Sequence, residues 1–185
     1  MIKHVIIRLD TILDSFPYNL EEIFALIGSK VKLKVDISQF KDLDRMSQFL
    51  HEKLSQNDLE VVCRILKEYD LSNVVGQARL YVDIKERLIS LSKRGLNIYA
   101  TSFLSKEAVE KILSKEGLSH VFKAIYARES GFTEHERVRS LIRGQGLKLE
   151  EAVYIGYPEP IKNINILALK PDEFIKENLM EEEFY

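Results

Sequence analysis

One stretch of the chain decides the fold: residues 80–102 read LYVDIKERLISLSKRGLNIYATS. Apolar residues recur at helical spacing in its first part, which predicts a helix over about Leu80 to Lys93. Gly95 can take the left-handed conformation that ends a helix. The apolar run from Leu96 to Ala100 then predicts a buried strand, and Thr101 follows directly at its end. A helix that leads at once into a buried strand is one step of an α/β fold.

The same alternation continues on both sides of this stretch. Upstream, Val5-Ile6-Ile7 with Leu9 has the unbroken apolar character of a buried parallel strand. Downstream, Ser105 can cap a helix that stops at Gly117. The patterns that follow predict a strand over 121–126, a helix over 134–144 and strands over 152–155 and 164–169. The sequence therefore predicts an α/β core, a Rossmann-like parallel sheet flanked by helices.

A helical segment interrupts this alternation near the N-terminus. Apolar residues at helical spacing predict helices over 20–27, 43–54 and 59–69, with Gly28 as the stop of the first. We expect them to form a small helical bundle inserted into the core. Cys63 lies on the third helix beside core-facing Val62 and is expected to be an inert buried thiol.

Composition excludes several classes of protein. The chain has 185 residues, is 45% hydrophobic and 30% charged, and contains no apolar run long enough to span a membrane. With one cysteine and no His-Glu-x-x-His helix, neither a disulfide nor a structural zinc site is expected. The N-terminus lacks the features of a signal peptide, so we expect a cytoplasmic protein without a membrane association.

Charge gives weaker guidance. The net charge of -2 provides no broad field for nucleic acid, and direct contact with nucleic acid is not expected, although Lys30, Lys32 and Lys34 could form a local basic patch. Six acidic residues against Lys176 alone lie between Asp172 and Tyr185. This acidic tail could meet a basic surface of a protein partner, or it could be a solvated, frayed terminus.

Residues 80–102 resemble the segment of the haloacid dehalogenase superfamily that runs from the cap to the second motif. In active members a Ser or Thr at the strand end binds the transferred phosphoryl group; Thr101 matches it, and Ser102 stands where Asn is usual. The resemblance extends to Gly117-Leu118, Val121-Phe122 and Val153–Gly156, and back to Val5–Asp10. It implies a core of residues 1–15 and 76–175, a helical C1-type cap of residues 16–75, and an acidic tail of residues 176–185.

The first motif of the family departs from this pattern at its reactive position. Family enzymes carry an Asp nucleophile at the end of the first strand, and Arg8 stands there. A guanidinium that stays protonated cannot attack phosphorus. Two residues later Asp10 matches the family's general acid and base. A register with Asp10 as nucleophile would put Ile12 in the acid position, so this rescue is poor.

The third and fourth motifs also differ from the active pattern. Phe132 replaces the Lys that offsets charge on the phosphate, and Tyr157 replaces the Asp that is the principal Mg²⁺ ligand. Arg128, Arg137 or Arg139 could reach the pocket, but solvated helix charges are the preferred interpretation. Glu159 is only a displaced candidate ligand, so the resemblance predicts no catalytic residue, no metal site and no cofactor, with Mg²⁺ required only if the protein is a phosphatase after all.

Four residues would remain of the phosphate pocket: Arg8, Asp10, Thr101 and Ser102. Strand-end N–H groups and Arg8 could hold an anion. Alternatively, Arg8 could pair with Asp10, Asp14 or Glu159 and fill the pocket, which is the preferred interpretation. For Tyr154 and Tyr157, close to the expected pocket, we favour buried packing over anchoring a partner.

Three functions fit these observations. The first is a catalytically inactive protein that acts as a binding or accessory subunit of a protein partner, through its cap surface or its acidic tail. The second is a divergent Mg²⁺-dependent phosphohydrolase. The third is a non-catalytic binder of a phosphorylated small molecule. The first is the preferred hypothesis because three reactive positions, Arg8, Phe132 and Tyr157, differ from the active pattern.

Overall fold

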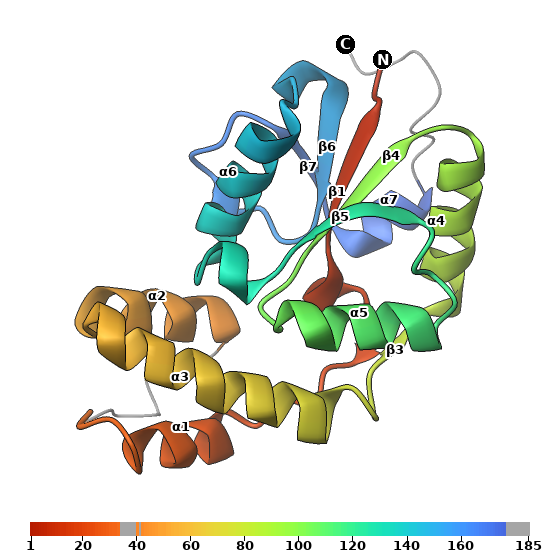
Figure 1. Cartoon of the computed structure of the whole chain (residues 1–185). Helices are drawn as coiled ribbons and strands as arrows, with labels where there is room; N and C mark the ends of the chain where they lie inside the picture. The colour runs from red at the N-terminus through yellow and green to blue at the C-terminus, as the bar shows by residue number, and fades with distance from the viewer. Residues whose placement is uncertain (34–39, 41, 177–185) are drawn as a thin grey trace.

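The computed structural model describes residues 1–33, 40 and 42–176 and contains a five-stranded parallel sheet (Figure 1). The strand order is β5-β4-β1-β6-β7. The strands are β1 (His4–Arg8), β4 (Asn97–Thr101), β5 (Phe122–Tyr126), β6 (Ala152–Ile155) and β7 (Leu167–Leu169). All four neighbouring pairs are parallel, which confirms the predicted α/β fold. Because β1 lies in the centre, its carboxyl end lies between those of β4 and β6.

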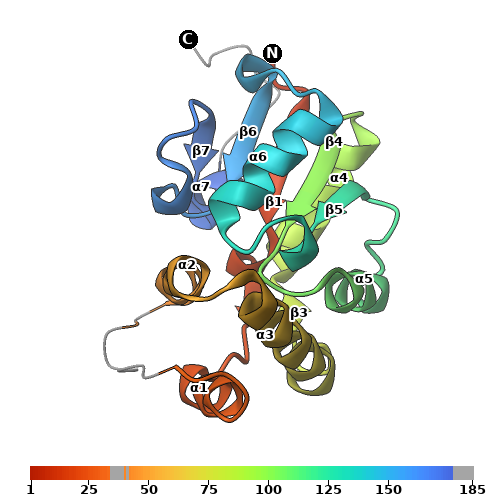
Figure 2. The same ribbon diagram turned by 60° about the vertical axis from the view of Figure 1, so that its left-hand side comes forward.

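Helices cover both faces of the sheet (Figure 2). The helices of the core are α4 (Val82–Lys93), α5 (Lys106–Lys115), α6 (Glu134–Gln145) and α7 (Pro171–Lys176). Along β1 the side chains alternate between two clusters: Ile6 packs with α6, whereas Val5 and Ile7 belong to the cluster that contains residues of α4 and α5. The sheet is therefore buried on both faces, as the continuous apolar run of β1 predicts.

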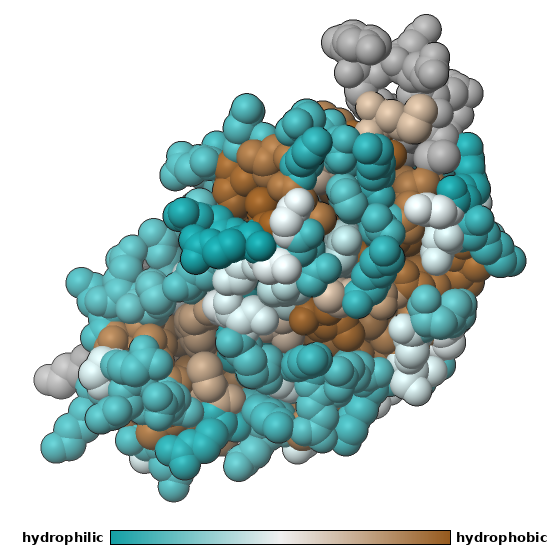
Figure 3. Space-filling model, turned by 45° about the horizontal axis from the view of Figure 1, so that its top comes forward, coloured by the Kyte–Doolittle hydropathy of each residue, from teal (hydrophilic) through white to brown (hydrophobic). Residues whose placement is uncertain are grey.

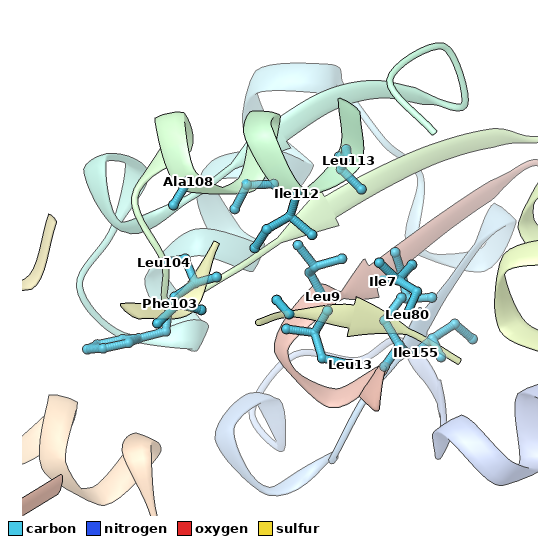
Figure 4. Close-up of a cluster of buried hydrophobic side chains, with 14 of the residues drawn as sticks. Ile7, Leu9, Leu13, Leu80, Phe103, Leu104, Ala108, Ile112, Leu113 and Ile155 are labelled. Carbon is cyan, nitrogen blue, oxygen red and sulfur yellow. The ribbon is translucent and has the colours of Figure 1, made fainter. Parts of the chain in front are cut away.

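The larger cluster joins the sheet to the segments that follow its strands (Figure 4). Ile7 and Ile155 come from adjacent strands, and Leu9 follows β1 directly. Ile112 reaches the same cluster from α5, and Leu80 reaches it from a short strand. This packing fixes the backbone just beyond the carboxyl ends of the strands, where the candidate site lies.

A second, two-stranded sheet connects the core to three further helices. Strand β2 (Leu13–Ser15) pairs antiparallel with β3 (Arg79–Leu80), and the chain between them, residues 16–78, is called the helical insertion below. The insertion contains α1 (Leu20–Gly28), α2 (Leu43–Lys53) and α3 (Gln56–Tyr69), and α3 continues into a π-helical turn, η3 (Asp70–Val74). Most of its described apolar side chains join the same large cluster as the core.

The structure corrects two predicted boundaries. Leu80 was predicted as the start of a helix but lies in β3, and α4 begins at Val82. The reason is the pairing of Leu80 with Leu13, a contact between distant segments that periodicity cannot reveal. Strand β7 is also shorter than the predicted 164–169. Short helical turns complete the chain: η1 (Leu9–Thr11), η4 (Arg128–Ser130), η5 (Leu149–Glu151) and η6 (Glu159–Ile161).

Local capping confirms several predicted helix ends. The Ser105 side chain accepts a hydrogen bond from the Ala108 N–H and caps α5. Gly95 and Gly117 adopt positive φ, 90° and 72°, two residues after the last residues of α4 and α5. These positions need a residue that adopts left-handed backbone conformations without strain, which favours glycine.

Two surface features predicted from the sequence, the basic patch and the acidic tail, lie partly outside the described residues. Hydrophilic side chains interrupt the apolar surface over most of the face seen in Figure 3. No helix in the described part of the chain is both long and apolar enough to cross a bilayer. Lys34 of the predicted basic patch and residues 177–185 of the predicted acidic tail lie outside the described residues.

Candidate functional site

The candidate site lies where the central strands β1 and β4 end side by side. Arg8 and Thr101 are the last residues of the two strands and face each other in the parallel register. Asp10 follows in η1, and Ser102 follows Thr101 directly. The four residues predicted from the sequence therefore lie together, and all of their side chains are buried or partly buried.

The Arg8 guanidinium is enclosed by carboxylates. The residue is 4% exposed. Its Nε lies 3.5 Å from Asp10 Oδ2, and its Nη1 donates a 2.7 Å hydrogen bond to Asp44 Oδ2. Asp44 belongs to α2, so the shorter contact joins the helical insertion to the central strand. Arg8 thus fills the strand end with an internal ion pair.

Sequence reasoning foresaw only one of these two carboxylates. Asp10 was among the predicted partners of Arg8, but the other two predicted partners are engaged elsewhere or exposed: Glu159 pairs with Lys162, and Asp14 is exposed. Asp44 was missed because 36 residues separate it from Arg8. Only the packing of α2 against the core brings it there.

The electrostatic setting keeps Arg8 charged. Burial lowers the pKa of Arg8, but the nearby carboxylates of Glu134, Asp10 and Asp44 outweigh burial and raise it well above its ordinary value. A permanently protonated guanidinium has no lone pair with which to act as a nucleophile or base. Arg8 can hold or orient anionic groups, and it cannot form a covalent bond to phosphorus.

Asp10 has both carboxylate oxygens engaged. Its Oδ1 accepts a 2.5 Å hydrogen bond from Ser102 Oγ, and its Oδ2 accepts a 2.9 Å bond from the Phe103 N–H. The same Oδ2 faces Arg8. This carboxylate therefore ties the segment after β1 to the segment after β4.

A second carboxylate, Glu134, lies at the centre of the site. Thr101 Oγ1 donates a 2.5 Å hydrogen bond to Glu134 Oε1, and the Tyr154 hydroxyl donates a 3.0 Å bond to the same oxygen. The Arg137 Nε donates to Glu134 Oε2 at 3.0 Å. Burial raises the pKa of Tyr154 well above its ordinary value, so its hydroxyl stays protonated as a donor. The hydroxyl of Thr101 therefore donates its hydrogen bond to a carboxylate of the same chain.

The sequence reasoning missed Glu134 and misassigned two arginines. Arg128 and Arg137 were predicted as solvated helix charges, yet their residues are 4% and 0% exposed; only Arg139 is exposed as predicted. Arg137 also donates to the carbonyls of Gly131 and Phe132, which anchors the turn before α6. The sequence does contain one signal for Glu134, the capping box of Thr133 and Glu136 at the start of α6. It fixes where the helix begins, and so which residues of its first turn point into the core.

A second buried ion pair lies at the junction of the insertion and the core. Arg128 Nη2 lies 3.0 Å from Asp70 Oδ2, and the Tyr18 hydroxyl donates to Asp70 Oδ1 at 2.9 Å. The Arg128 guanidinium also lies over the Phe103 ring, 4.7 Å from its centroid. Two separate ion pairs therefore join the insertion to the core: Arg8 with Asp44, and Arg128 with Asp70.

The replaced positions of the third and fourth motifs, Phe132 and Tyr157, carry no charged groups into the site. Phe132 is 7% exposed and packs edge-on against Phe103. Tyr154 is buried as predicted, but Tyr157 is 55% exposed, so the expectation of buried packing for Tyr157 was wrong. The reason is that Tyr157 follows the strand end, in the segment that leaves the sheet before η6.

The residues at the site do not fit Mg²⁺. This ion takes an octahedron of oxygen ligands, anchored to the protein by one or two carboxylates that must be free to coordinate it. Both carboxylate oxygens of Asp10 already accept hydrogen bonds, from Ser102 and the Phe103 N–H, and one of them also faces the Arg8 cation. Glu159 is paired with Lys162 on the surface. In the described part of the chain, no three His, Cys, Asp or Glu side chains gather as a metal site.

The fold and this site define the class of protein: a doubly wound α/β domain with a helical insertion after its first strand and polar groups at the ends of its central strands. The family model of the haloacid dehalogenase-like hydrolases matches residues 9–157. The chain therefore belongs to this family. The match begins one residue after Arg8.

Solved structures share this fold. A predicted phosphatase from Clostridium acetobutylicum superposes with a TM-score of 0.66 at 18% identity, covering 95% of this chain and 97% of the other. A β-phosphoglucomutase from Clostridium difficile gives a TM-score of 0.64 at 15% identity, with 97% and 94% covered. At these identities the likeness establishes the fold alone. No curated protein matches the chain.

Proposed function

We propose that this haloacid dehalogenase-like protein does not transfer phosphoryl groups and acts instead as a binding or accessory subunit. One observation carries the proposal: Arg8, at the end of the central strand, is 4% exposed and pairs with Asp10 and Asp44. A guanidinium in this position cannot form a phosphorylated intermediate.

The charges around Arg8 support the same conclusion. The cluster contains two cations, Arg8 and Arg137, and three carboxylates, Asp10, Asp44 and Glu134, so its formal charge is 2 − 3 = −1. A phosphate dianion would enter against this charge and would have to displace hydrogen bonds that are already made. The cluster is therefore a poor phosphate site, which argues against non-catalytic phosphate binding at the ends of the central strands as well.

The surface of the helical insertion bears on how a partner would bind. Among the described residues of the insertion, Leu26 is the one large hydrophobic that stands out as exposed, at 41%. A contact through a broad apolar patch on the described part of the insertion is therefore not supported. We favour polar contacts, with the acidic residues 172–185 meeting a basic surface of a protein partner.

The alternative is a divergent Mg²⁺-dependent phosphohydrolase. Membership of a family of hydrolases favours it. So does the resemblance of Asp10 and Thr101 to positions that active members use. It requires the Arg8 ion pairs to open and Asp10 to exchange its present partners for substrate or metal.

A phosphatase assay separates the two functions. The full-length chain is incubated with p-nitrophenyl phosphate and with a set of sugar and nucleoside phosphates, with and without Mg²⁺. We expect no turnover above that of Asp10→Asn, with both chains folded as judged by circular dichroism. Mg²⁺-dependent turnover by the unmodified chain that disappears in Asp10→Asn would overturn the proposal and establish the phosphohydrolase.

The binding role needs its own test. The full chain and a version lacking residues 177–185 are purified in parallel from the native cell, and co-eluting chains are identified. We expect a stoichiometric partner with the full chain only, lost at raised salt because acidic and basic surfaces are screened. Recovery of both versions as isolated monomers would count against an accessory role.

A further inference from the structure

A hollow of about 630 Å³ is lined mainly by residues of α6 and of the segment between β6 and β7, which packs beside this helix. The hollow is not lined by any residue of the charged cluster at the strand ends, which consists of Arg8, Asp10, Asp44, Glu134 and Arg137. Its volume is in the range of small-molecule sites, which is about 300–1,000 Å³. The hollow is therefore separate from the strand-end site and large enough for a ligand.

One wall of the hollow carries unpaired positive charge. Arg139 and Arg143 lie one helical turn apart on α6, line the hollow and are both exposed. Neither guanidinium has a carboxylate partner within the described ranges of the chain. Like charges four residues apart on a helix destabilise it slightly. An anion between the two forks would remove this repulsion and gain charge-assisted hydrogen bonds.

The other wall and the floor have a different character. Asn163 and Asn165 line the hollow from the segment before β7, and both are exposed. Ile142 and Ile164 also line it, and both pack partly buried against the smaller apolar cluster of the core. Each amide offers a donor and an acceptor, so the hollow combines cations, hydrogen-bonding edges and an apolar surface.

We propose that this hollow binds a phosphate monoester carried on a flat apolar group, of which a nucleoside monophosphate is the representative. The two guanidinium forks match the oxygens of a dianionic phosphate. The apolar floor accommodates a ring, and the two asparagine amides can pair with polar ring edges as they do with nucleobases. Such a ligand uses the two guanidinium groups, the two amides and the apolar side chains that line the hollow.

The test uses adenosine 5′-monophosphate as the probe, with inorganic phosphate and adenosine as separate arms. Binding is measured by calorimetry and by thermal unfolding. We expect the monophosphate to raise the Tm by about 5–10 °C at 100 times its Kd, and to bind at least about tenfold more tightly than either fragment. Arg139→Gln and Arg143→Gln should each weaken binding about tenfold or more, because each removes one charge-assisted contact.

Arg94→Gln is the matched control, since Arg94 is an exposed arginine outside the hollow. It should leave the Kd within about twofold, because no contact with the ligand is removed. Equal losses in Arg94→Gln and Arg139→Gln would overturn the proposal by revealing a nonspecific charge effect. Equal affinity for adenosine and its monophosphate, or no binding of the monophosphate, would overturn it too. Because the hollow does not include Asp10, an absence of binding leaves the outcome of the phosphatase assay unaffected.

Discussion

The ion pair between Arg8 and Asp44 should couple the stability of the helical insertion to that of the core. Arg8 Nη1 donates to Asp44 Oδ2 at 2.7 Å, with side-chain exposures of 4% and 30%. Removing one partner of a buried pair costs about 3–5 kcal/mol. We expect less for Asp44→Asn, about 2 kcal/mol, because Asp44 is partly solvated and Arg8 keeps Asp10 as a second partner.

The measurement is a double-mutant cycle on the unfolding free energy. Arg8→Met, Asp44→Asn and the double variant are unfolded in urea and followed by circular dichroism. We expect a coupling energy of about 1.5–2 kcal/mol, which is typical of a charge-assisted hydrogen bond away from full solvent. Asp44→Asn alone should lower the Tm by about 4–8 °C in a chain of this length.

A matched pair on the surface provides the control. Lys162 Nζ and Glu159 Oε1 are 2.8 Å apart, almost the same distance, but their side chains are 64% and 81% exposed. The corresponding cycle of Lys162→Met and Glu159→Gln should give no measurable coupling because water screens the pair. A coupling for Arg8 and Asp44 that is no larger than this control would refute the reasoning that burial gives this contact its strength.

Three further predictions concern stability and reactivity. Glu134→Gln should cost about 3–5 kcal/mol in urea unfolding, because Arg137, 0% exposed, loses its partner; a loss under 1 kcal/mol would contradict this. Gly131→Ala should destabilise by about 1–3 kcal/mol, because the new Cβ would lie 2.5 Å from a neighbouring side chain, whereas Gly28→Ala, with open space around it, should be neutral or stabilising by about 0.5–1 kcal/mol. Burial raises the pKa of the Cys63 thiol, so alkylation by iodoacetamide should show a midpoint at higher pH than a free thiol, and an equal midpoint would argue against burial as the cause.

The part of the fold that depends on local patterns was predictable. The apolar run before Arg8 predicted the central strand, and the alternation of helix and strand after Gly95 predicted a parallel sheet. These patterns are readable because buried strands and helix faces repeat within a few residues. The short pairing of β2 with β3 was missed because its two strands have three and two residues and are joined through the whole insertion.

The sequence by itself determined which chemical groups stand at the ends of the central strands: a cation at Arg8, a carboxylate at Asp10 and a hydroxyl at Thr101. Only the tertiary structure decided what those groups contact. Asp44 arrives from the helical insertion, and Glu134 arrives from the first turn of α6. The type of a side chain is a property of one position in the sequence. The partners of a buried charge are the groups that tertiary packing brings within about 4 Å of it, and no local sequence pattern predicts that distance.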